Sequence, residues 1–363
     1  MIRRLLLAVL AGALVLSACS SSDEEDATPA PVDEEPAEVE EPEEDPGPVG
    51  DPSPLTGVPI ADELHDQPLI IVKIENTPQA RPQTGLDYAD IVIEEVVEFG
   101  ITRFMVLLHS ELPEIAGPIR SARPVDVELV SMFGRSIFAY SGARAEVQAM
   151  LAPTPVLRMS DDAGSLSFFR DTVRRAPHNL YTRPAELLEA TAIRQPDPVP
   201  DIGWTFSDEP PAGEAACPVG ATDCTNPGEA VTINMSSTYI TRWEYDAAEG
   251  VYRRLQNGQP FLTSQGGQVG IPSEREVGAA NVIIVGTRHY IGESGYPETD
   301  ATTPEAGERA VVLRDGNWYE ARWRKPTARD NIELLTPDGQ PFPLKPGPSW
   351  IHLPSTADVP NVG

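Results

Sequence analysis

The chain has 363 residues and a formal net charge of −29 at pH 7, from 56 acidic and 27 basic residues. This balance argues against nucleic acid as a partner, because binding to phosphates requires a basic surface. Residues 23–51 hold 14 of the acidic residues and none of the basic ones, and Arg3 and Arg4 precede an apolar leader. The other 42 acidic and 25 basic residues give the folded part a charge of −17, an ordinary margin for solubility. The length is sufficient for two domains with appendages.

The N-terminus has the features of a secretion signal. Two arginines precede an apolar stretch over residues 5–16, and the sequence Leu-Ser-Ala-Cys ends at Cys19. An apolar run of about 12 residues is too short to span a bilayer, which takes roughly 20. Because Leu-Ser-Ala-Cys resembles the bacterial lipobox, we expect removal of residues 1–18 and acylation of Cys19, which would anchor the protein to a membrane through at least two acyl chains.

Residues 19–54 are predicted to form a disordered, acidic, proline-rich linker. After Cys19 this stretch consists mainly of Ser, Asp, Glu, Pro and Ala, so it has almost nothing to bury and cannot offset the entropy lost on ordering. Charge repulsion and proline favour extension, so roughly 35 residues at about 3.1 Å each could reach about 100 Å. We expect a tether that lifts the folded part away from the membrane.

Residues 55–198 are predicted to form an N-terminal α/β domain. Apolar and β-branched runs predict strands, and amphipathic spacing with terminal Gly or Pro predicts helices. The predicted strands are 69–74, 89–97, 104–108 and 136–140, and the predicted helices are 125–133, 143–151 and 184–194. Strands that alternate with helices are typical of α/β or α+β architecture.

Residues 199–363 are predicted to form a smaller, β-rich C-terminal domain, so that the fold class is α+β. Turn signals recur about every ten residues, including Asn257-Gly258 and Asp315-Gly316, which favours an antiparallel sheet or barrel. Predicted strands are 230–235, 239–245, 251–255, 281–285, 310–313, 318–323 and 350–353. The turn-rich segment 292–306 is predicted to be an exposed loop.

Cysteine chemistry is limited to three residues. Cys19 is assigned to the lipid, and Cys217 and Cys224, with six residues between them, follow a proline-rich hinge at residues 195–200. Outside the cytoplasm this pair predicts a small disulfide. Two thiols without a neighbouring His or further Cys cannot complete a tetrahedral metal site, so we expect no metal and no cofactor.

The candidate ligand-binding residues are arginines at strand ends and turns, with polar residues of one further loop. A planar guanidinium group binds carboxylates and phosphates through two parallel hydrogen bonds, so such arginines favour a site for an anionic ligand. The predicted set is Arg81, Arg103, Arg120, Arg123, His178, Asn179 and Tyr181. Glu94, Glu95 and Glu98 are the acids expected to face these arginines.

Five segments carry a family resemblance: residues 80–86 (Ala-Arg-Pro-Gln-Thr-Gly-Leu), 89–92, 100–104, 117–124 (Gly-Pro-Ile-Arg-Ser-Ala-Arg-Pro) and 176–181 (Ala-Pro-His-Asn-Leu-Tyr). In this order they resemble the YerB-like bacterial lipoproteins, a domain-of-unknown-function family. The family pattern has tyrosine where this chain has Ile93 and glycine where it has Phe99. The resemblance implies a membrane-anchored extracytoplasmic protein with an N-terminal α/β domain and a β-rich C-terminal domain, and it implies no reaction.

Three functions are compatible with these patterns. The first is binding of an anionic envelope ligand (a wall glycan, polymer or peptide) in an arginine-rich cleft, by a protein anchored to the outer face of the cytoplasmic membrane. The second is glycan hydrolysis with Glu94 or Glu95 as acid or base, and His178 as a further catalytic candidate. In the third, the Arg and Glu residues form structural pairs, and function lies in contact with an envelope protein. Binding is favoured over catalysis because no nucleophile motif or metal spacing is present.

Overall fold

The computed structural model describes residues 50–211, 228–264, 269–270, 272–292 and 295–361. The predicted signal sequence, the lipidation site Cys19, the linker up to residue 49 and the pair Cys217 and Cys224 lie outside these residues. The chain divides into two units, residues 1–45 and residues 46–363. All the features described below belong to the second unit.

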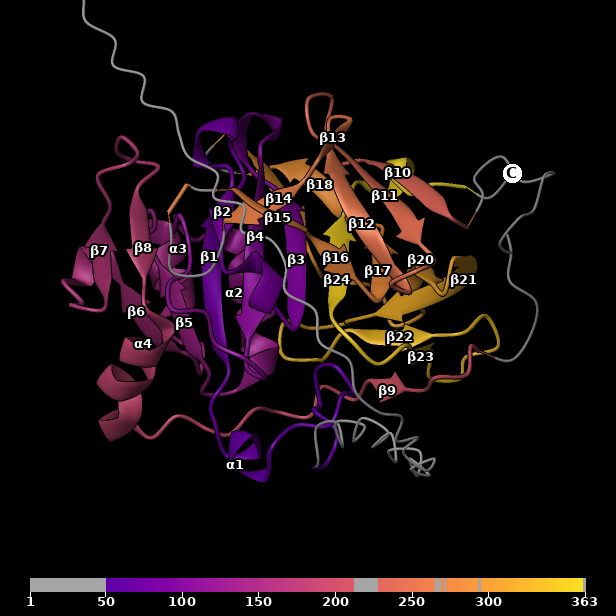
Figure 1. Cartoon of the computed structure of the whole chain (residues 1–363), viewed down its shortest axis with the longest axis horizontal. Coiled ribbons are helices and arrows are strands. Elements are labelled where there is room, and N and C mark those ends of the chain that lie inside the picture. The colour runs from indigo at the N-terminus through magenta and orange to yellow at the C-terminus, as the bar shows by residue number, and fades with distance from the viewer. Residues whose placement is uncertain (1–49, 212–227, 265–268, 271, 293–294, 362–363) are drawn as a thin grey trace, which may run out of the picture. The chain divides into compact units, whose positions relative to one another are not determined.

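One mixed sheet of ten strands runs through both halves of the described chain (Figure 1). In spatial order its strands are β22 (Glu333–Leu335), β21 (Asn317–Arg324), β20 (Glu308–Arg314), β17 (Asn281–Val285), β24 (Ser349–Leu353), β3 (Ile91–Val96), β4 (Thr102–Leu108), β1 (Ile70–Glu75), β5 (Ile137–Tyr140) and β6 (Leu157–Ser160). The halves join where β24 pairs with β3 in parallel. The C-terminal half, predicted as the smaller domain, contributes five of the ten strands.

The α+β class predicted from the sequence is confirmed. The N-terminal helices are α1 (Asp62–His65), α2 (Pro124–Val130), α3 (Ala145–Leu151) and α4 (Pro184–Thr191). A 3₁₀ turn extends α2 to Phe133, and another extends α4 to Arg194, so both reach the ends predicted from the sequence. The division into domains 55–198 and 199–363 stays a prediction, because the continuous sheet does not by itself define a boundary.

Different elements cover the two faces of the large sheet. On one face, Val125 and Leu129 of α2 pack in one buried cluster with Ile71 and Met105 of the sheet. On the other face lies a second sheet, which contains β10 (Ala230–Asn234), β11 (Ile240–Asp246), β12 (Val251–Gln256), β13 (Gln259–Pro260) and β16 (Gly278–Ala279). Because side chains alternate along a strand, neighbouring residues of β1, β3 and β4 enter different cores.

Four small sheets complete the fold. They pair β14 (Leu262–Ser264) with β15 (Pro272–Glu276) and β2 (Gln83–Thr84), β7 (Phe168–Arg170) with β8 (Leu180–Thr182), β9 (Thr205–Phe206) with β23 (Pro343–Leu344), and β18 (Arg288–Ile291) with β19 (Pro297–Asp300). Among the described residues, no helix is both long enough and apolar enough to cross a membrane.

The prediction of an exposed loop over residues 292–306 is wrong in part. Residues 297–300 form β19, which pairs with β18, and Thr299 and Ala301 are buried. The sequence does not predict this strand, because Pro-Glu-Thr-Asp has no apolar alternation.

Phe99 adopts a φ of 64°, the left-handed region that glycine enters without a steric penalty. This position is the one at which the family pattern has glycine.

The shared sheet predicts a single cooperative unfolding transition for the two halves. All five tryptophans lie in the C-terminal half, and Leu107 is fully buried in the N-terminal half. We expect Leu107→Ala to cost about 2–5 kcal/mol, because it leaves a cavity in a packed core. Tryptophan fluorescence during urea unfolding should report this loss with one transition. Leu166→Ala, at a side chain that is 95% exposed, is the control. Separate transitions for fluorescence and far-ultraviolet circular dichroism would contradict the prediction.

Candidate functional site

The structure brings three of the resembling loops together beside the end of β1. Thr84 N donates to Gly117 O (2.8 Å), and Ile119 N donates to Leu180 O (2.7 Å). The Arg174 guanidinium donates to Pro82 O at 2.7 Å. The peptide bonds Arg81-Pro82, Gly117-Pro118 and Ala176-Pro177 in these loops are all cis. Segments that are 33 to 92 residues apart in sequence therefore form one surface.

Three of the four predicted arginines gather on the α2 face. Arg103 begins β4, opposite Glu75 of β1 and Glu95 of β3. Its Nη1 donates to Ser121 O at 2.7 Å, and Arg123 Nη1 donates to the same oxygen at 3.2 Å. Burial, together with the charge of Arg123, lowers the pKa of Arg103 to about 10. Arg103 is itself a buried side chain, so it presents little surface to a ligand.

The α2-face cluster contains as many carboxylates as cations. Arg123 Nε lies 2.7 Å from Glu98, and Arg120 Nε lies 3.4 Å from Glu75. The four cations are Lys73, Arg103, Arg120 and Arg123, and the four carboxylates are Glu75, Glu95, Glu98 and Asp126. Since burial disfavours unpaired charge, this balance is what a structural cluster requires.

His178 joins the α2-face cluster through Glu75. Its Nδ1 lies 2.9 Å from Glu75 Oε1, which also accepts a hydrogen bond from the Thr77 hydroxyl at 2.7 Å. About a quarter of the His178 side chain is exposed, whereas the Glu75 side chain is almost fully buried. This contact orients the imidazole, but the described residues supply no serine, threonine or cysteine hydroxyl or thiol in hydrogen-bond contact with its Nε2.

Asn179 and Tyr181 hold their own loop. The Asn179 side chain accepts a hydrogen bond from Arg170 at 3.2 Å and donates to Asp171 O at 2.8 Å. The Tyr181 hydroxyl accepts a hydrogen bond from Arg174 at 2.5 Å. Burial raises the pKa of Tyr181 to about 12. Both side chains therefore use their polar atoms on residues of the same chain.

Glu95 shares one ammonium group with a second carboxylate. Lys73 Nζ forms an ion pair with Glu95 and lies 2.6 Å from Asp126 Oδ1, and all three side chains are fully buried. Two carboxylates cannot both be neutralised by one lysine. Burial and the charge of Asp126 raise the pKa of Glu95 to about 7, and Glu95 Oε2 has no hydrogen-bond partner among the described residues.

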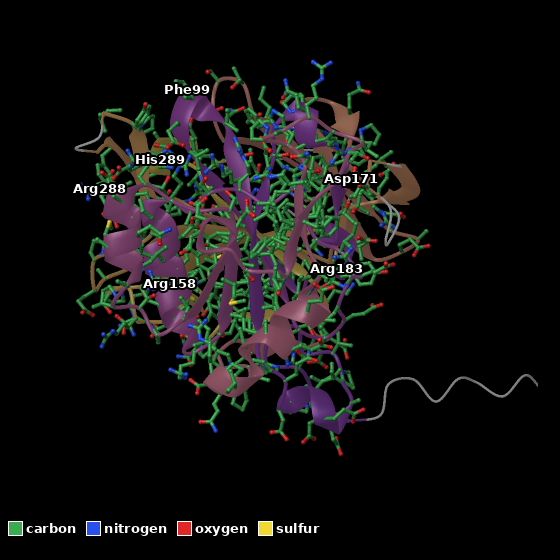
Figure 2. The ribbon with its side chains drawn as sticks, turned by 90° about the vertical axis from the view of Figure 1, so that its left-hand side faces the viewer. Phe99, Arg158, Asp171, Arg183, Arg288 and His289 are labelled. Atoms are coloured by element: carbon green, nitrogen blue, oxygen red, sulfur yellow. The ribbon has the colours of Figure 1, made fainter. Side chains whose placement is uncertain are left out.

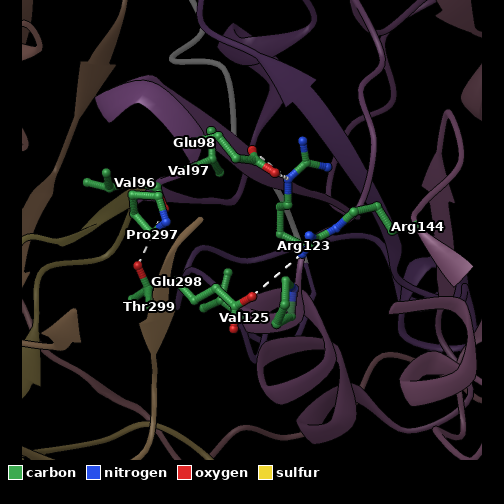
Figure 3. Close-up of a pocket in the computed structure, with 10 residues that line it drawn as sticks. Val96, Val97, Glu98, Arg123, Val125, Arg144, Pro297, Glu298 and Thr299 are labelled. Carbon is green, nitrogen blue, oxygen red and sulfur yellow. Dashed lines mark hydrogen bonds and ion pairs between the residues drawn. The ribbon is translucent and has the colours of Figure 1, made fainter. Parts of the chain in front are cut away.

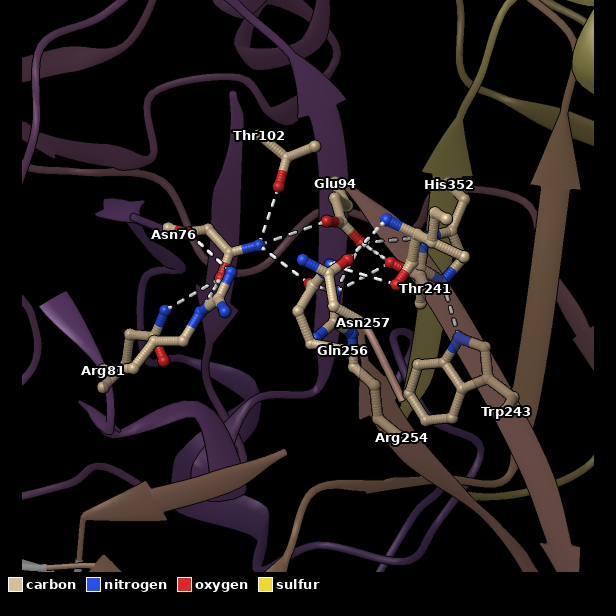
Figure 4. A network of polar contacts seen from close by, with 12 residues as sticks. Asn76, Arg81, Glu94, Thr102, Thr241, Trp243, Arg254, Gln256, Asn257 and His352 are labelled. Atoms are coloured by element: carbon tan, nitrogen blue, oxygen red, sulfur yellow. Dashed lines mark hydrogen bonds and ion pairs between the residues drawn. The ribbon is translucent and has the colours of Figure 1, made fainter. Parts of the chain in front are cut away.

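Glu94 lies on the opposite face of β3, at the centre of a second buried network (Figure 4). Its Oε2 accepts a hydrogen bond from Arg254 Nη2 at 2.9 Å and lies 3.0 Å from His352 Nδ1. His352 Nε2 in turn accepts a hydrogen bond from Trp243 Nε1 at 2.9 Å. Burial alone would raise the pKa of Glu94, but Arg254 and His352 hold it well below its usual range. Burial lowers the pKa of His352, so this imidazole stays neutral.

Arg81 lies at the outer end of the Glu94 network. Its Nε donates to Asn76 Oδ1 at 3.1 Å and its Nη2 donates to Asn76 O at 2.9 Å. Asn76 Nδ2 lies 3.3 Å from Glu94 Oε1, which completes the link to the network. Burial, followed by the charge of Arg254, lowers the pKa of Arg81 to about 10. Among the described residues, no carboxylate oxygen lies within 4.0 Å of the Arg81 guanidinium nitrogens.

Arg81 also lines a groove of about 230 Å³, which we call the Arg81 groove. Its lining residues are Arg81, Pro82, Gln256, Gln259, Pro260, Phe261 and Leu262. The Arg81 guanidinium carbon lies 5.6 Å from the centre of the Phe261 ring. The groove therefore combines one cation with two amides and an apolar wall.

Charge is unbalanced in the Glu94 network. Arg81 and Arg254 carry two positive charges, Glu94 carries one negative charge, and His352 is neutral. Glu94 forms its ion pair with Arg254, so the uncompensated positive charge is that of Arg81, which lines the groove. A buried or half-buried charge normally has a partner of opposite sign, and here an anionic ligand can supply it.

Sequence reasoning missed the residues that the C-terminal half contributes. Arg254, Gln256, Phe261 and His352 are absent from the predicted set, yet each of them contacts Arg81, Asn76 or Glu94. The signal in β12 is misleading, because Val251 and Leu255 suggest an inward apolar face. The structure instead buries Tyr252, Arg254 and Gln256. Within the described part of the chain, no group of three or more His, Cys, Asp and Glu residues is arranged to hold a metal ion.

Comparisons with known proteins cover most of the chain. A family model described as "Protein of unknown function (DUF3048) N-terminal domain" matches residues 55–197, and its C-terminal counterpart matches residues 231–351. The chain is 29% identical over 326 residues to a protein of Bacillus subtilis (strain 168) named "Putative lipoprotein YerB", covering 85% of this chain and 88% of that protein. A crystal structure of the Bacillus subtilis YerB protein gives a TM-score of 0.66 at 25% identity, over 83% of this chain and 96% of that one.

Removal of Arg254 should be strongly destabilising. Arg254→Met leaves the Glu94 carboxylate buried without its main cation, and the expected loss is about 3–5 kcal/mol of unfolding free energy at pH 7. The double variant Glu94→Gln, Arg254→Met should recover part of this loss in urea unfolding. Arg242→Met is the control, since Arg242 on the adjacent strand β11 forms an exposed pair with Glu244. Exposed pairs contribute less than about 1 kcal/mol. Equal losses of unfolding free energy in Arg254→Met and Arg242→Met would contradict the prediction.

Glu95 should make stability fall as the pH rises. The folded protein keeps a proton on Glu95 up to about pH 7, whereas the unfolded chain loses it near pH 4.5. The folded state thus binds more protons in this window, so the free energy of unfolding declines between about pH 4.5 and pH 7. Glu95→Gln should flatten that decline in urea unfolding measured at several pH values.

Glu98 provides a control for the pH experiment, because its pKa is shifted in the opposite direction from that of Glu95. Although burial opposes the shift, the hydrogen bond and charge of Arg123 lower the pKa of Glu98. Its contribution to stability is therefore present above its ordinary pKa and is lost as the pH falls through the lowered pKa. Glu98→Gln should change stability at high pH and leave the decline between pH 4.5 and pH 7 in place. A decline that persists unchanged in Glu95→Gln would contradict the assignment.

Proposed function

The chain belongs to the DUF3048 family, as its loop motifs predicted, and we propose that it is a lipid-anchored envelope protein that binds an anionic ligand in the Arg81 groove. The relative named as a lipoprotein supports the anchor, together with the lipobox-like sequence at Cys19. Acylation of Cys19, the outer face of the cytoplasmic membrane as the location, and an anion as the ligand are parts of this proposal.

The uncompensated charge of Arg81 is the observation that carries the proposal. Arg103, Arg120 and Arg123 lie in a cluster whose carboxylates equal its cations in number. Arg103 donates to a neutral carbonyl but is buried, whereas Arg81, whose hydrogen-bond partners are the neutral side chain and carbonyl of Asn76, lines the groove. The proposal therefore keeps the predicted ligand class and moves its centre to one of the predicted arginines.

The lining of the groove favours a carboxylate attached to a small apolar body. A volume of about 230 Å³ corresponds to roughly eight water-sized groups. Phe261, Leu262 and the two prolines offer apolar contact, while the amides of Gln256 and Gln259 can hydrogen-bond a peptide group. Among wall glycans, polymers and peptides, a short peptide with a free C-terminal carboxylate fits this chemistry best.

The groove lies remote from the start of the folded part. Figure 1 shows β13, which lines the groove, at the top of the view and α1 at the bottom. Asp51 is held beside α1, because its carbonyl oxygen lies 3.2 Å from His65 Nε2. The groove is therefore remote from Asp51, one of the first residues that the structure describes.

The two alternative functions gain less support. Glycan hydrolysis by Glu94 or Glu95 requires a carboxylate that reaches substrate, and both side chains are fully buried on opposite faces of β3. A purely structural role describes the balanced α2-face cluster well. It leaves the charge of Arg81 unexplained, so it does not account for the groove.

Binding should depend on the carboxylate of the ligand and on Arg81. We expect N-acetyl-Ala-Ala to bind the purified folded part, and its C-terminal amide to bind at least tenfold more weakly, as measured by isothermal titration calorimetry. Arg81→Gln should lose about 10- to 100-fold in affinity for the acid, because a charge-assisted hydrogen bond contributes about 1.5–3 kcal/mol. Arg81→Lys should retain part of it.

Arg123→Gln is the matched control, since Arg123 is paired with Glu98 outside the groove. Its affinity for N-acetyl-Ala-Ala should equal that of the wild type. Circular dichroism should verify that each variant is folded. Equal affinity for acid and amide, or an Arg81→Gln variant that binds as well as the wild type, would rule out the proposed site.

A further inference from the structure

A run of exposed aromatic rings and charged side chains lies beside Glu98 and Arg123 of the α2-face cluster. It consists of Phe99 in a 3₁₀ turn, Arg144 before α3, and Arg288, Tyr290, Tyr296, Glu298 and Asp300 of the β18–β19 hairpin. We call this set the aromatic platform. None of its residues lines the Arg81 groove.

Phe99 is the most unusual member of the platform. Its side chain is 81% exposed, and its backbone has a φ of 64° and a ψ of 18°. A bulky residue rarely adopts this left-handed conformation, and residues held there cluster at ligand-binding positions. Figure 2 shows Phe99 at the upper margin of the ribbon, with Arg288 and His289 below it. The fold thus tolerates an unfavourable backbone conformation at a position where the ring gains no burial.

Short distances connect the rings and charges into one continuous surface. The Phe99 and Tyr296 ring centres are 6.1 Å apart in an edge-to-face arrangement. The Arg144 guanidinium carbon lies 5.5 Å from the centre of the Tyr296 ring, and Arg144 Nη2 lies 3.5 Å from Glu298. On the hairpin, Arg288 lies 4.9 Å from the centre of the Tyr290 ring, and Tyr290 pairs with Glu298 across the strands.

A small recess opens beside the platform (Figure 3). Its lining includes Glu98, Arg123, Arg144 and Glu298, and its volume is about 10 Å³. This volume is about the minimum that holds one water-sized group. A single hydroxyl would fit there, with carboxylate oxygens and guanidinium nitrogens as hydrogen-bond partners.

The charges on and beside the aromatic platform indicate which kinds of ligand it can bind. Two guanidinium groups, of Arg144 and Arg288, stand among three carboxylates, of Glu146, Glu298 and Asp300. An anionic polymer or an anionic lipid surface would find no excess of positive charge here. Arg144 lies against the Tyr296 ring and Arg288 against the Tyr290 ring, so the rings do not form the continuous apolar patch that a protein helix would cover.

We propose that the aromatic platform binds an uncharged glycan strand. The C–H bonds on one face of a sugar ring carry partial positive charge, and an aromatic ring has a negative face that attracts them. The hydroxyl groups at the rim of the sugar would meet Arg144, Glu298 and the recess. This inference goes beyond the proposed peptide-binding groove and does not rest on it, because the two sites share no residue.

The test uses chitohexaose, an uncharged N-acetylglucosamine oligomer, titrated into the folded part of the chain. Binding is followed by chemical-shift changes in the NMR spectra of the protein and by calorimetry. Binding is expected, with loss of about tenfold or more in Phe99→Gly and in Tyr296→Ala. Glycine accepts the left-handed backbone, so Phe99→Gly removes the ring without unfolding the turn. Leu166→Ala, which also removes a strongly exposed apolar side chain, should bind as the wild type.

Three outcomes would overturn the platform proposal. They are no binding of chitohexaose at millimolar concentration, binding that Phe99→Gly leaves unchanged, and a Phe99-dependent association with phosphatidylglycerol vesicles in place of the glycan. Arg81→Gln distinguishes the two proposals, because it should retain full affinity for chitohexaose while it loses N-acetyl-Ala-Ala. Failure of the peptide experiment therefore leaves the glycan experiment intact, and the reverse also holds.

Discussion

The ion pair between Glu94 and Arg254 is the constraint around which the two halves of this structure are arranged. Glu94 belongs to β3 of the N-terminal half, and Arg254 belongs to β12, 160 residues later. Both side chains are fully buried, so neither charge would be tolerated without the other. The contact helps to fix where the second sheet lies on the large sheet, since β12 must bring Arg254 over Glu94 of β3. His352 of β24 and Trp243 of β11 close the same network from two further strands.

Strand β3 separates two electrostatic environments by one peptide unit. Glu94 and Glu95 point to opposite faces because side chains alternate along a strand. Glu94 meets a guanidinium group and keeps its negative charge, whereas Glu95 competes with Asp126 for a single ammonium group and holds a proton up to about pH 7. Two adjacent and chemically similar residues thus respond to pH in opposite directions. The difference originates in the strands that pack above and below β3.

Local patterns in the sequence were sufficient for most of the N-terminal half. Continuous apolar runs located β1, β3 and β4, and the apolar spacing before Gly134 located α2. Patterns failed where burial contradicts hydrophobicity. In β12 the apolar residues Val251 and Leu255 are only partly buried, whereas the strand buries Tyr252, Arg254 and Gln256, and Arg254 pairs with Glu94. β19 carries only Pro, Glu, Thr and Asp, and its pairing with β18 depends on a partner strand that no local pattern reveals.

The contacts of the four predicted arginines show why residue type alone cannot identify a binding site. The sequence offered Arg81, Arg103, Arg120 and Arg123 as equivalent, because each stands at a strand end or turn beside a conspicuous loop motif. Their partners make them different: three share a cluster in which carboxylates match cations, and Arg81 has only the neutral groups of Asn76. Those partners lie up to 45 positions away in the sequence, so the charge balance becomes visible only when the chain is folded. The surplus at Arg81 follows directly from Glu94, because the carboxylate that could have neutralised Arg81 is already committed to Arg254. The interaction that joins the two halves therefore also leaves one cation available at the groove.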